Sequence, residues 1–219
     1  MKRFFDIVAS ALGLAVLTPV LLAIGVWIKL DSPGPVLYRG RRVGRNGRPF
    51  NILKFRSMVV DAEKIGASST GDDDPRITRP GRILRRYKLD ELPQLLNVLL
   101  GTMSFVGPRP QVQWAVELYG PDERRLLDVR PGITDYASLV YRNEGELLRG
   151  STDPDKDYLE KIAPGKTRLG LEYVRNHSLG VDVKILLATA HALCGASPDW
   201  CLPAAHRPGE AAPARVAQS

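Results

Sequence analysis

The hydrophobic positions of this chain are concentrated at its amino end. No charged residue occurs between Ile7 and Ile28. A helix rises about 1.5 Å per residue, so a block of this length is sufficient to cross the hydrocarbon of a bilayer. The block is too long for the core of a signal peptide, and the residues around Trp27 make a poor cleavage site. The pattern therefore predicts a membrane helix over residues 1–30.

Two features favour a re-entrant helix hairpin over a straight spanning helix. Pro19 lacks a backbone donor and its ring clashes with the carbonyl of Ala15, so it bends a helix, while the Thr18 hydroxyl can satisfy a freed carbonyl. Lysine and arginine flank the block on both sides, and cationic flanks prefer the cytoplasmic face. Both flanks meet that preference only if the chain turns back at Thr18-Pro19. Proline also occurs in ordinary spanning helices, so the straight alternative remains open.

The remaining pattern predicts short elements. Two strands are expected over residues 36–38 and 50–55, with a turn at residues 44–47 between them. The polar, turn-rich segment 61–80 is expected to be a loop. Its acidic residues 72–74 have the chemistry of a metal site, but a solvated loop is the better interpretation.

Helical periodicity dominates the second half of the chain. From residue 82 to residue 100 it is interrupted by Pro93, which predicts two short helices meeting near Asp90. The second is amphipathic and suited to the membrane interface. Residues 101–110 are expected to be a loop. Further helices are expected over residues 111–129 (broken at Gly120), 158–176 and 181–193.

These elements predict an α+β fold that is mostly helical. It combines a small β element, amphipathic interfacial helices and the amino-terminal re-entrant membrane helix hairpin. One domain is expected over residues 31–195. Residues 196–219 are rich in proline, alanine and polar residues, which predicts a disordered tail.

The charge balance narrows the partners. The net charge is +7 at pH 7, so nucleic acid, an acidic membrane surface or a phosphorylated substrate are candidate anionic partners. The basic residues lack the aromatic interleaving of a single-strand nucleic-acid binder. The two cysteines, Cys194 and Cys201, follow neither a CxxC nor a zinc pattern and are expected to be reduced thiols.

Adjacent carboxylates are the first candidates for chemistry. Asp90 and Glu91 follow a cluster of cationic residues, namely Arg82, Arg85, Arg86 and Lys88. At a predicted helix start, carboxylates can simply cap the helix. A carboxylate that attacks phosphorus, however, needs nearby cations to offset the phosphate charge, and a metal held by a neighbouring carboxylate would add to them.

The segment Pro108-Arg109-Pro110 supports the chemical interpretation. Its two prolines fix φ on both sides of Arg109, so the guanidinium extends from a stiff backbone. A planar guanidinium held in this way suits bidentate contact with phosphate. An ordinary turn between elements is the alternative.

Several motifs together resemble those of the bacterial sugar transferases, the monotopic phosphoglycosyl transferases that begin glycoconjugate assembly on polyprenol phosphate. The resemblance covers roughly residues 2–193, beginning with Lys2-Arg3-Phe4-Phe5-Asp6. Its internal motifs, in order, are Lys54-Phe55-Arg56-Ser57-Met58, Leu89-Asp90-Glu91-Leu92-Pro93-Gln94, Met103-Ser104-Phe105-Val106-Gly107-Pro108-Arg109-Pro110 and Arg130-Pro131-Gly132-Ile133-Thr134.

The resemblance implies a mechanism. Asp90 would attack the β-phosphate of a UDP-sugar, releasing UMP and leaving a phosphosugar on the aspartate, and undecaprenyl phosphate would then take the phosphosugar. Glu91 would hold Mg²⁺. Substrate phosphate or nucleotide contacts would come from Lys54, Arg85, Arg109 and Asp182, although Asp182 could instead cap a helix.

The resemblance also implies a location. The membrane helix would break at Thr18-Pro19, where the family usually has Ser-Pro. The chain would lie in the bacterial inner (cytoplasmic) membrane, in contact with inner-leaflet lipid, with its catalytic domain on the cytoplasmic face. It would be the minimal catalytic form, and a homodimer is compatible with the sequence. No nucleic-acid partner is expected.

Two segments depart from the family pattern. Residues 134–138 read Thr-Asp-Tyr-Ala-Ser where the family usually continues with glycine after the threonine, and residues 144–161 are longer than the common form. Both segments are expected where the sugar or base would be recognised, so the departures leave the sugar and the glycan pathway open but not the type of reaction. A catalytically inactive scaffold is the rival interpretation of the whole chain, and the intact Asp90-Glu91 pair argues against it.

Overall fold

The computed structural model describes residues 1–67 and 69–203. Its strands are β1 (Leu37–Val43), β2 (Pro49–Phe55), β3 (Ser104–Val106) and β4 (Gly132–Thr134). Its α-helices are α1 (Lys2–Asp31), α2 (Arg79–Arg86), α3 (Gln94–Leu100), α4 (Gln113–Glu117), α5 (Tyr136–Val140), α6 (Glu144–Leu147), α7 (Pro154–Asp157), α8 (Ala163–Asn176) and α9 (Leu179–Leu193). Helices therefore predominate over small sheets, as predicted.

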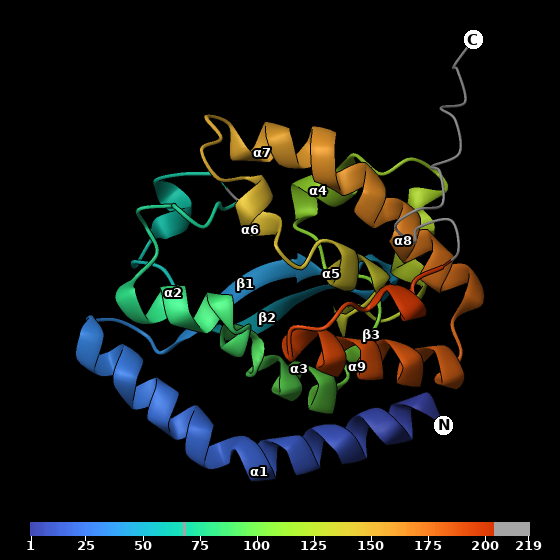
Figure 1. The fold of residues 1–219 in the computed structure, drawn as a ribbon, viewed down its shortest axis with the longest axis horizontal. Coiled ribbons are helices and arrows are strands. Elements are labelled where there is room, and N and C mark those ends of the chain that lie inside the picture. Colours follow the sequence, from blue (N-terminus) through green and yellow to red (C-terminus); the bar gives the residue numbers. More distant parts are fainter. Residues whose placement is uncertain (68, 204–219) are drawn as a thin grey trace.

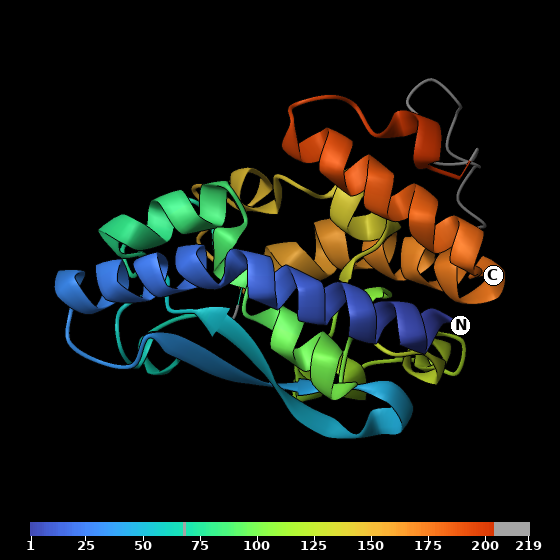
Figure 2. The same ribbon diagram turned by 90° about the horizontal axis from the view of Figure 1, so that it is seen from below.

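The hydrophobic block forms α1, which lies along the underside of the other elements (Figures 1 and 2). It is long and apolar enough to cross a membrane, and most of its apolar stretch is exposed. Figure 1 shows that it bends near its middle, and Pro19 lies inside the helix. The Thr18 Oγ1 donates to the Leu14 carbonyl at 2.7 Å. The block is thus one bent helix, without a connecting loop between two arms.

Both ends of α1 are attached to the rest of the protein. Near its start, Arg3 donates to the carbonyls of Val98 (2.5 Å) and Leu99 (2.7 Å) in the last turn of α3, where the helix dipole favours a cation. At its end, Arg56 donates to the carbonyls of Ser32 (2.8 Å) and Pro33 (2.5 Å). These charge-assisted bonds fix where the chain enters and leaves the membrane helix.

The strands form two separate two-stranded sheets. β1 and β2 make the predicted antiparallel hairpin, with Tyr38 opposite Lys54. Its turn uses positive φ at Asn46 and Gly47, which asparagine and glycine tolerate. β3 and β4 pair in parallel, although the sequence predicted only a loop around β3. A Cβ on Gly132 would lie 2.1 Å from the Gly107 nitrogen, so this pairing requires glycine.

The largest core cluster lies between β3, α5, α8 and α9. Its most buried members are Val106, Leu169, Tyr173, Ile185 and Ala188. Cys201 and Leu202 belong to the same cluster, at the end of a 3-10 turn over Asp199–Cys201. The predicted tail therefore begins with residues that pack into the core, and its remainder, residues 204–219, lies outside the described residues. Cys194 and Cys201 are free thiols, as predicted.

The predicted helices differ in how well they match the structure. α8 and α9 lie within or close to the expected ranges, and the predicted helix pair near Asp90 is present as α2 and α3. The helix expected over residues 111–129 is broken at Gly120-Pro121, as predicted, but its two parts are shorter than expected. That stretch contains α4 and a 3-10 helix over Glu123–Asp128, because Gly120 and Pro121 interrupt the helical hydrogen bonds.

Candidate active site

A large cleft opens above the β1–β2 hairpin. It has a volume of about 1880 Å³ and is bounded by α2, the hairpin, the loop after β3, α6 and residues 57–72. Lysine and arginine far outnumber aspartate and glutamate along its walls. Walls of one charge sign raise the local concentration of ligands of the opposite sign. The cationic lining includes Arg39, Arg41, Lys54, Arg82, Arg85, Arg109, Arg142 and Arg149.

Asp90 lies in this cleft, on a single 3-10 turn at Leu89–Glu91 between α2 and α3. Lys88 has a left-handed backbone (φ 56°) and redirects the chain into that turn. Asp90 is 7% exposed, and its Oδ1 has no hydrogen-bond partner in the described part of the chain. α3 begins after Pro93 without a side-chain cap. The capping alternative for Asp90 is therefore wrong, and its buried Oδ1 is available to a ligand.

Glu91 is held by two cations from distant segments. The Lys54 Nζ, on β2, donates to the Glu91 Oε1 at 3.0 Å. The Arg109 guanidinium donates to both carboxylate oxygens, by Nη1 to Oε2 at 3.2 Å and by Nη2 to Oε1. Three of the motifs singled out in the sequence therefore meet at one carboxylate.

The two adjacent carboxylates have opposite pKa shifts. Burial raises the pKa of Asp90 and the charge of Glu91 adds to this, while Lys54 and Arg85 oppose it. Burial alone would also raise the pKa of Glu91, but Arg109 and Lys54 outweigh it and hold that pKa well below its usual range. Burial lowers the pKa of Lys54. Glu91 is thus an anion with a hydrogen bond at each oxygen, and Asp90 is the carboxylate that retains an unpaired oxygen.

Arg85 lies on α2 and lines the same cleft. Its charge is among those that lower the pKa of Asp90. The site therefore gathers five of the six predicted site residues of the catalytic domain, namely Asp90, Glu91, Arg85, Arg109 and Lys54. Thr18 and Pro19 belong to α1, away from the residues that line the cleft.

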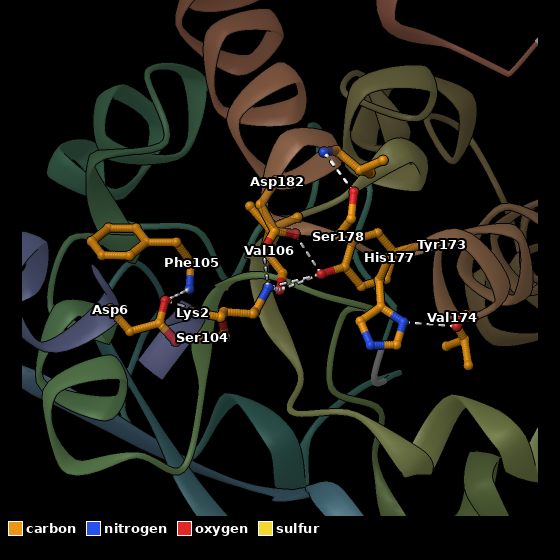
Figure 3. A network of polar contacts seen from close by, with 11 residues as sticks. Lys2, Asp6, Ser104, Phe105, Val106, Tyr173, Val174, His177, Ser178 and Asp182 are labelled. Carbon is orange, nitrogen blue, oxygen red and sulfur yellow. Dashed lines mark hydrogen bonds and ion pairs between the residues drawn. The ribbon is translucent and has the colours of Figure 1, made fainter. Parts of the chain in front are cut away.

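Asp182 lies elsewhere. It accepts hydrogen bonds from the Lys2 Nζ at 2.6 Å and from the Tyr173 hydroxyl at 2.7 Å (Figure 3). It is buried and does not line the cleft. The cap of α9 is Ser178, which accepts from the Val181 nitrogen, so the capping alternative for Asp182 is wrong. Its observed partners join α1, α8 and α9.

The same network holds β3. The Lys2 Nζ and the Tyr173 hydroxyl both donate to the Val106 carbonyl, at 2.9 and 3.1 Å. The Asp6 Oδ1 accepts from the Ser104 Oγ at 3.1 Å and the Phe105 nitrogen at 3.2 Å (Figure 3). Because β3 leads directly into the loop that carries Arg109, the first turns of α1 help to position that arginine.

A second group of cleft residues was not assigned as a group from the sequence, although Glu144 and Tyr158 belong to the segment 144–161 that was expected near the sugar or base. Lys166 forms an ion pair with Glu144, and its Nζ lies 5.1 Å from the centre of the Tyr158 ring. The Tyr158 hydroxyl accepts from the Gln111 Nε2 at 3.2 Å. All four line the cleft. No local motif links them, since they come from separate segments that only the tertiary fold brings together.

The acidic pair could contribute to a metal site. Among the described residues no group of three or more His, Cys, Asp or Glu side chains is placed to hold a metal ion. Mg²⁺, however, usually binds through one or two carboxylates together with substrate phosphates and water. The unpaired Asp90 Oδ1 and the Glu91 Oε2, which has one hydrogen bond, fit such an ion in the presence of a phosphate ligand.

The fold and the site together define a class. A long apolar helix attached to a domain whose cationic cleft surrounds a buried carboxylate pair is typical of a membrane-associated protein that handles phosphate groups. The profile of one family, the bacterial sugar transferases, matches residues 1–196. The chain belongs to this family, as its motifs predicted.

Three relatives illustrate the match. The exopolysaccharide production protein PSS of Rhizobium leguminosarum bv. phaseoli is 43% identical over 196 residues, covering 86% of this chain and 92% of the relative. The UDP-glucose:undecaprenyl-phosphate glucose-1-phosphate transferase of Escherichia coli K12 is 42% identical over 197 residues, 86% of this chain. The UDP-N-acetylgalactosamine-undecaprenyl-phosphate N-acetylgalactosaminephosphotransferase of Aeromonas hydrophila is 38% identical over 200 residues, 88% of this chain.

The relatives differ in length. The chain spans 39% of the E. coli protein and 43% of the Aeromonas protein, but nearly all of the Rhizobium protein. The matched region is therefore the portion that these proteins share.

The position of Asp182 predicts a role in stability. Asp182→Asn leaves Lys2 without its anion, so the free energy of unfolding should fall by about 1–3 kcal/mol, the cost of losing a hydrogen bond to a charged group. Thermal unfolding in detergent would measure this, with the exposed Asp128→Asn as the matched control. UDP affinity by calorimetry should stay unchanged. A weakened UDP affinity at an unchanged melting temperature would instead make Asp182 a substrate ligand.

Proposed function

We propose that this protein transfers a sugar 1-phosphate from a UDP-sugar to undecaprenyl phosphate, the first membrane step in building a bacterial glycoconjugate such as an exopolysaccharide, capsule, O-antigen or glycoprotein glycan. The observation that carries the proposal is the buried Asp90, whose Oδ1 has no partner within a strongly cationic cleft. The relatives named as undecaprenyl-phosphate sugar-phosphate transferases support the choice of substrates.

The proposed reaction has two steps on one phosphorus atom. An Asp90 carboxylate oxygen attacks the β-phosphorus of the UDP-sugar, and the bond from that phosphorus to the bridging oxygen breaks, so UMP leaves with the bridging oxygen. A phosphate oxygen of undecaprenyl phosphate then attacks the same phosphorus. The bond to Asp90 breaks, which restores the carboxylate and yields the polyprenyl diphosphosugar.

The surrounding residues suit this chemistry. Arg85, Arg109 and Lys54 supply fixed positive charge where charge develops on the phosphates. Glu91 holds Arg109 and Lys54 in place through its hydrogen bonds. The low pKa of Glu91 keeps this carboxylate ionised and the ion pairs intact. The desolvated Asp90, with an oxygen free of hydrogen bonds, is the better nucleophile of the pair.

Mg²⁺ is the proposed cofactor, held by Glu91 together with the phosphates of the donor. When bound, it would withdraw charge from the phosphate oxygens. The protein positions Glu91 for this role because Glu91 and Asp90 lie on the same 3-10 turn.

We further propose that α1 is re-entrant in the inner membrane and that the catalytic domain faces the cytoplasm. Arg3 near one end and Ser32 just past the other are both bonded to the same domain. A helix that crossed roughly 30 Å of hydrocarbon would separate its two ends onto opposite sides. The apolar side chains that α1, α3 and α9 expose, including Val16, Leu100 and Leu187, suit contact with inner-leaflet lipid.

Replacing Asp90 tests the nucleophile. Asp90→Asn should abolish UMP release, measured with purified protein, UDP-sugars, Mg²⁺ and undecaprenyl phosphate, because an amide cannot act as the nucleophile. Intact-mass spectrometry should find a phosphosugar adduct on the wild type and none on the variant. Asp128→Asn, an exposed aspartate outside the cleft, should behave as the wild type. An adduct on Asp90→Asn would refute the assignment.

Metal removal tests the cofactor. Treatment with EDTA should stop UMP release, and added Mg²⁺ should restore it. Glu91→Gln should raise the Mg²⁺ concentration needed for half-maximal rate, since the amide is a weaker ligand. Full activity in EDTA would exclude the metal from the reaction.

Thiol labelling tests the topology. In a Cys194→Ser background, a cysteine placed directly before Met1 (behind a new initiator) and a second variant, Arg48→Cys, should both react with a membrane-impermeant maleimide only in inside-out vesicles. According to the re-entrant proposal, both positions lie on the cytoplasmic side of the membrane, together with the catalytic domain. Labelling of the first site in right-side-out cells would establish a spanning helix instead.

A further inference from the structure

We propose that a small cavity adjoining the main cleft is the subsite that recognises the transferred sugar, and that Asp135 is its specificity-determining residue. The proposal rests on the proposed function, because it assigns the part of the donor that the Asp90 site leaves unaccounted for. Asp135 stands directly after Thr134, where the family usually has glycine.

The cavity is contiguous with the cleft. Its volume is about 210 Å³, equivalent to roughly seven water molecules at about 30 Å³ each, which is the scale of one monosaccharide. Arg109, whose guanidinium pairs with Glu91 beside Asp90, lines both spaces. A ligand held at Asp90 by its phosphate can therefore extend past Arg109 into the cavity. The residues common to both are Arg109, Gln111, Ala115, Tyr158 and Lys166.

Asp135 supplies a buried acceptor in this cavity. It is 2% exposed and begins α5, where its Oδ1 accepts from the Ser138 nitrogen and the Ser138 Oγ, both at 2.7 Å. The described residues give its Oδ2 no hydrogen-bond partner. Asp135 lines the cavity, so this second carboxylate oxygen is open to a ligand there, and burial raises the pKa of Asp135. A hydroxyl group of a bound ligand would satisfy this oxygen.

Other residues that line the cavity offer donors and an aromatic face. Lys166 carries three donors, of which its ion pair with Glu144 uses one. A π-helical turn over Tyr158–Ile162 presents Tyr158 to both spaces, and such turns are frequent at functional sites. Sugar hydroxyls both donate and accept. A cavity lined by a carboxylate, a lysine and a tyrosine that it shares with the cleft therefore matches a ring of hydroxyl groups.

The order of groups in the donor favours the sugar over uridine as the occupant. Asp90 is proposed to attack the β-phosphorus, to which the sugar is attached directly, while the nucleoside lies one phosphate further away. Fewer bonds therefore separate the β-phosphorus from the sugar than from the nucleoside, so the sugar is the group that would reach the cavity next to Arg109. The large cleft, with cationic walls, is left for the uridine phosphate and the lipid phosphate.

Overall similarity does not account for sugar choice in the relatives. A relative named for glucose is 42% identical and one named for N-acetylgalactosamine is 38% identical over almost the same region. Sugar preference within such a shared scaffold must depend on a few local side chains. A buried carboxylate among them would discriminate strongly between sugars that differ in one hydroxyl. A site built to bond a particular hydroxyl rejects an analogue that lacks it far more strongly than a hydrophobic pocket does.

Asp135→Asn is the decisive variant. Asparagine keeps the α5 cap through its carbonyl oxygen but replaces the Oδ2 acceptor with a donor. We expect kcat/KM for the preferred UDP-sugar to fall at least about tenfold, and the ratio between donors that differ at one hydroxyl to change by a similar factor. Inhibition by UDP and UMP should stay within twofold of the wild type, and so should the melting behaviour.

Two further variants keep the test falsifiable. Asp153→Asn is the matched control, because Asp153 is an exposed cap of α7 that accepts from the Lys156 nitrogen at 3.1 Å and lines neither space. It should leave the donor ratio unchanged. Ala163→Leu narrows the cavity from α8 without touching Asp135. It should reduce turnover of the bulkier N-acetylated donors more than that of hexose donors, even if Asp135→Asn fails to fold.

The outcomes separate this inference from the function on which it rests. An unchanged donor ratio in both Asp135→Asn and Ala163→Leu, with the wild type releasing UMP, would overturn the subsite alone. If Asp135→Asn weakens inhibition by UDP by the same factor as it lowers turnover, the cavity is a nucleoside site. That result would also overturn the sugar subsite. If the wild type releases no UMP from any UDP-sugar, the proposed function itself fails.

Discussion

The buried pairing of Glu91 with Lys54 and Arg109 is the interaction on which the site depends. It ties a single 3-10 turn, strand β2 and the loop after β3 to one carboxylate. Removing one member of such a set leaves an uncompensated buried charge, at a cost of roughly 3–5 kcal/mol. The arrangement also leaves Asp90 as the carboxylate without a full set of partners. One residue of the pair organises the cleft, and its neighbour is left free to react.

The membrane helix is part of this organisation. Lys2 and Asp6, in its first two turns, bond to β3, and β3 continues into the segment that carries Arg109. Arg3 bonds to the end of α3, whose start follows the Asp90 turn. Hydrogen bonds from α1 to β3 and to α3 therefore fix the position of α1 relative to the segments on both sides of the acidic pair. An anchor that only tethered the domain would not need these buried contacts, so the geometry of the membrane helix and that of the site are fixed together.

The sequence predicted the features that are local. The hydrophobic block, the hairpin with its Asn46-Gly47 turn and the helices on either side of Asp90 follow from patterns within a few residues of each other. Family resemblance assigned Lys54, Glu91 and Arg109 to one site, but it gave the two cations to the substrate phosphates and did not predict their ion pairs with Glu91. The β3–β4 pairing was missed because each strand has three residues, too few for a periodic signal. The partners of Asp182 and the group around Lys166 were missed because they join segments far apart in the chain, which no local pattern encodes.

The shape of the site agrees with a reaction in which two phosphates use one nucleophile in turn. In the proposed route the sugar phosphate must stay at Asp90 while UMP leaves and the lipid phosphate arrives, so the sugar needs a holding site separate from the path of exchange. A broad cationic cleft beside a small cavity with a buried carboxylate provides that division. Diffuse positive charge accepts either phosphate with little discrimination, whereas directional hydrogen bonds in a desolvated cavity discriminate strongly. Reaction type and sugar choice can then change independently, which is consistent with one shared scaffold among relatives named for different sugars.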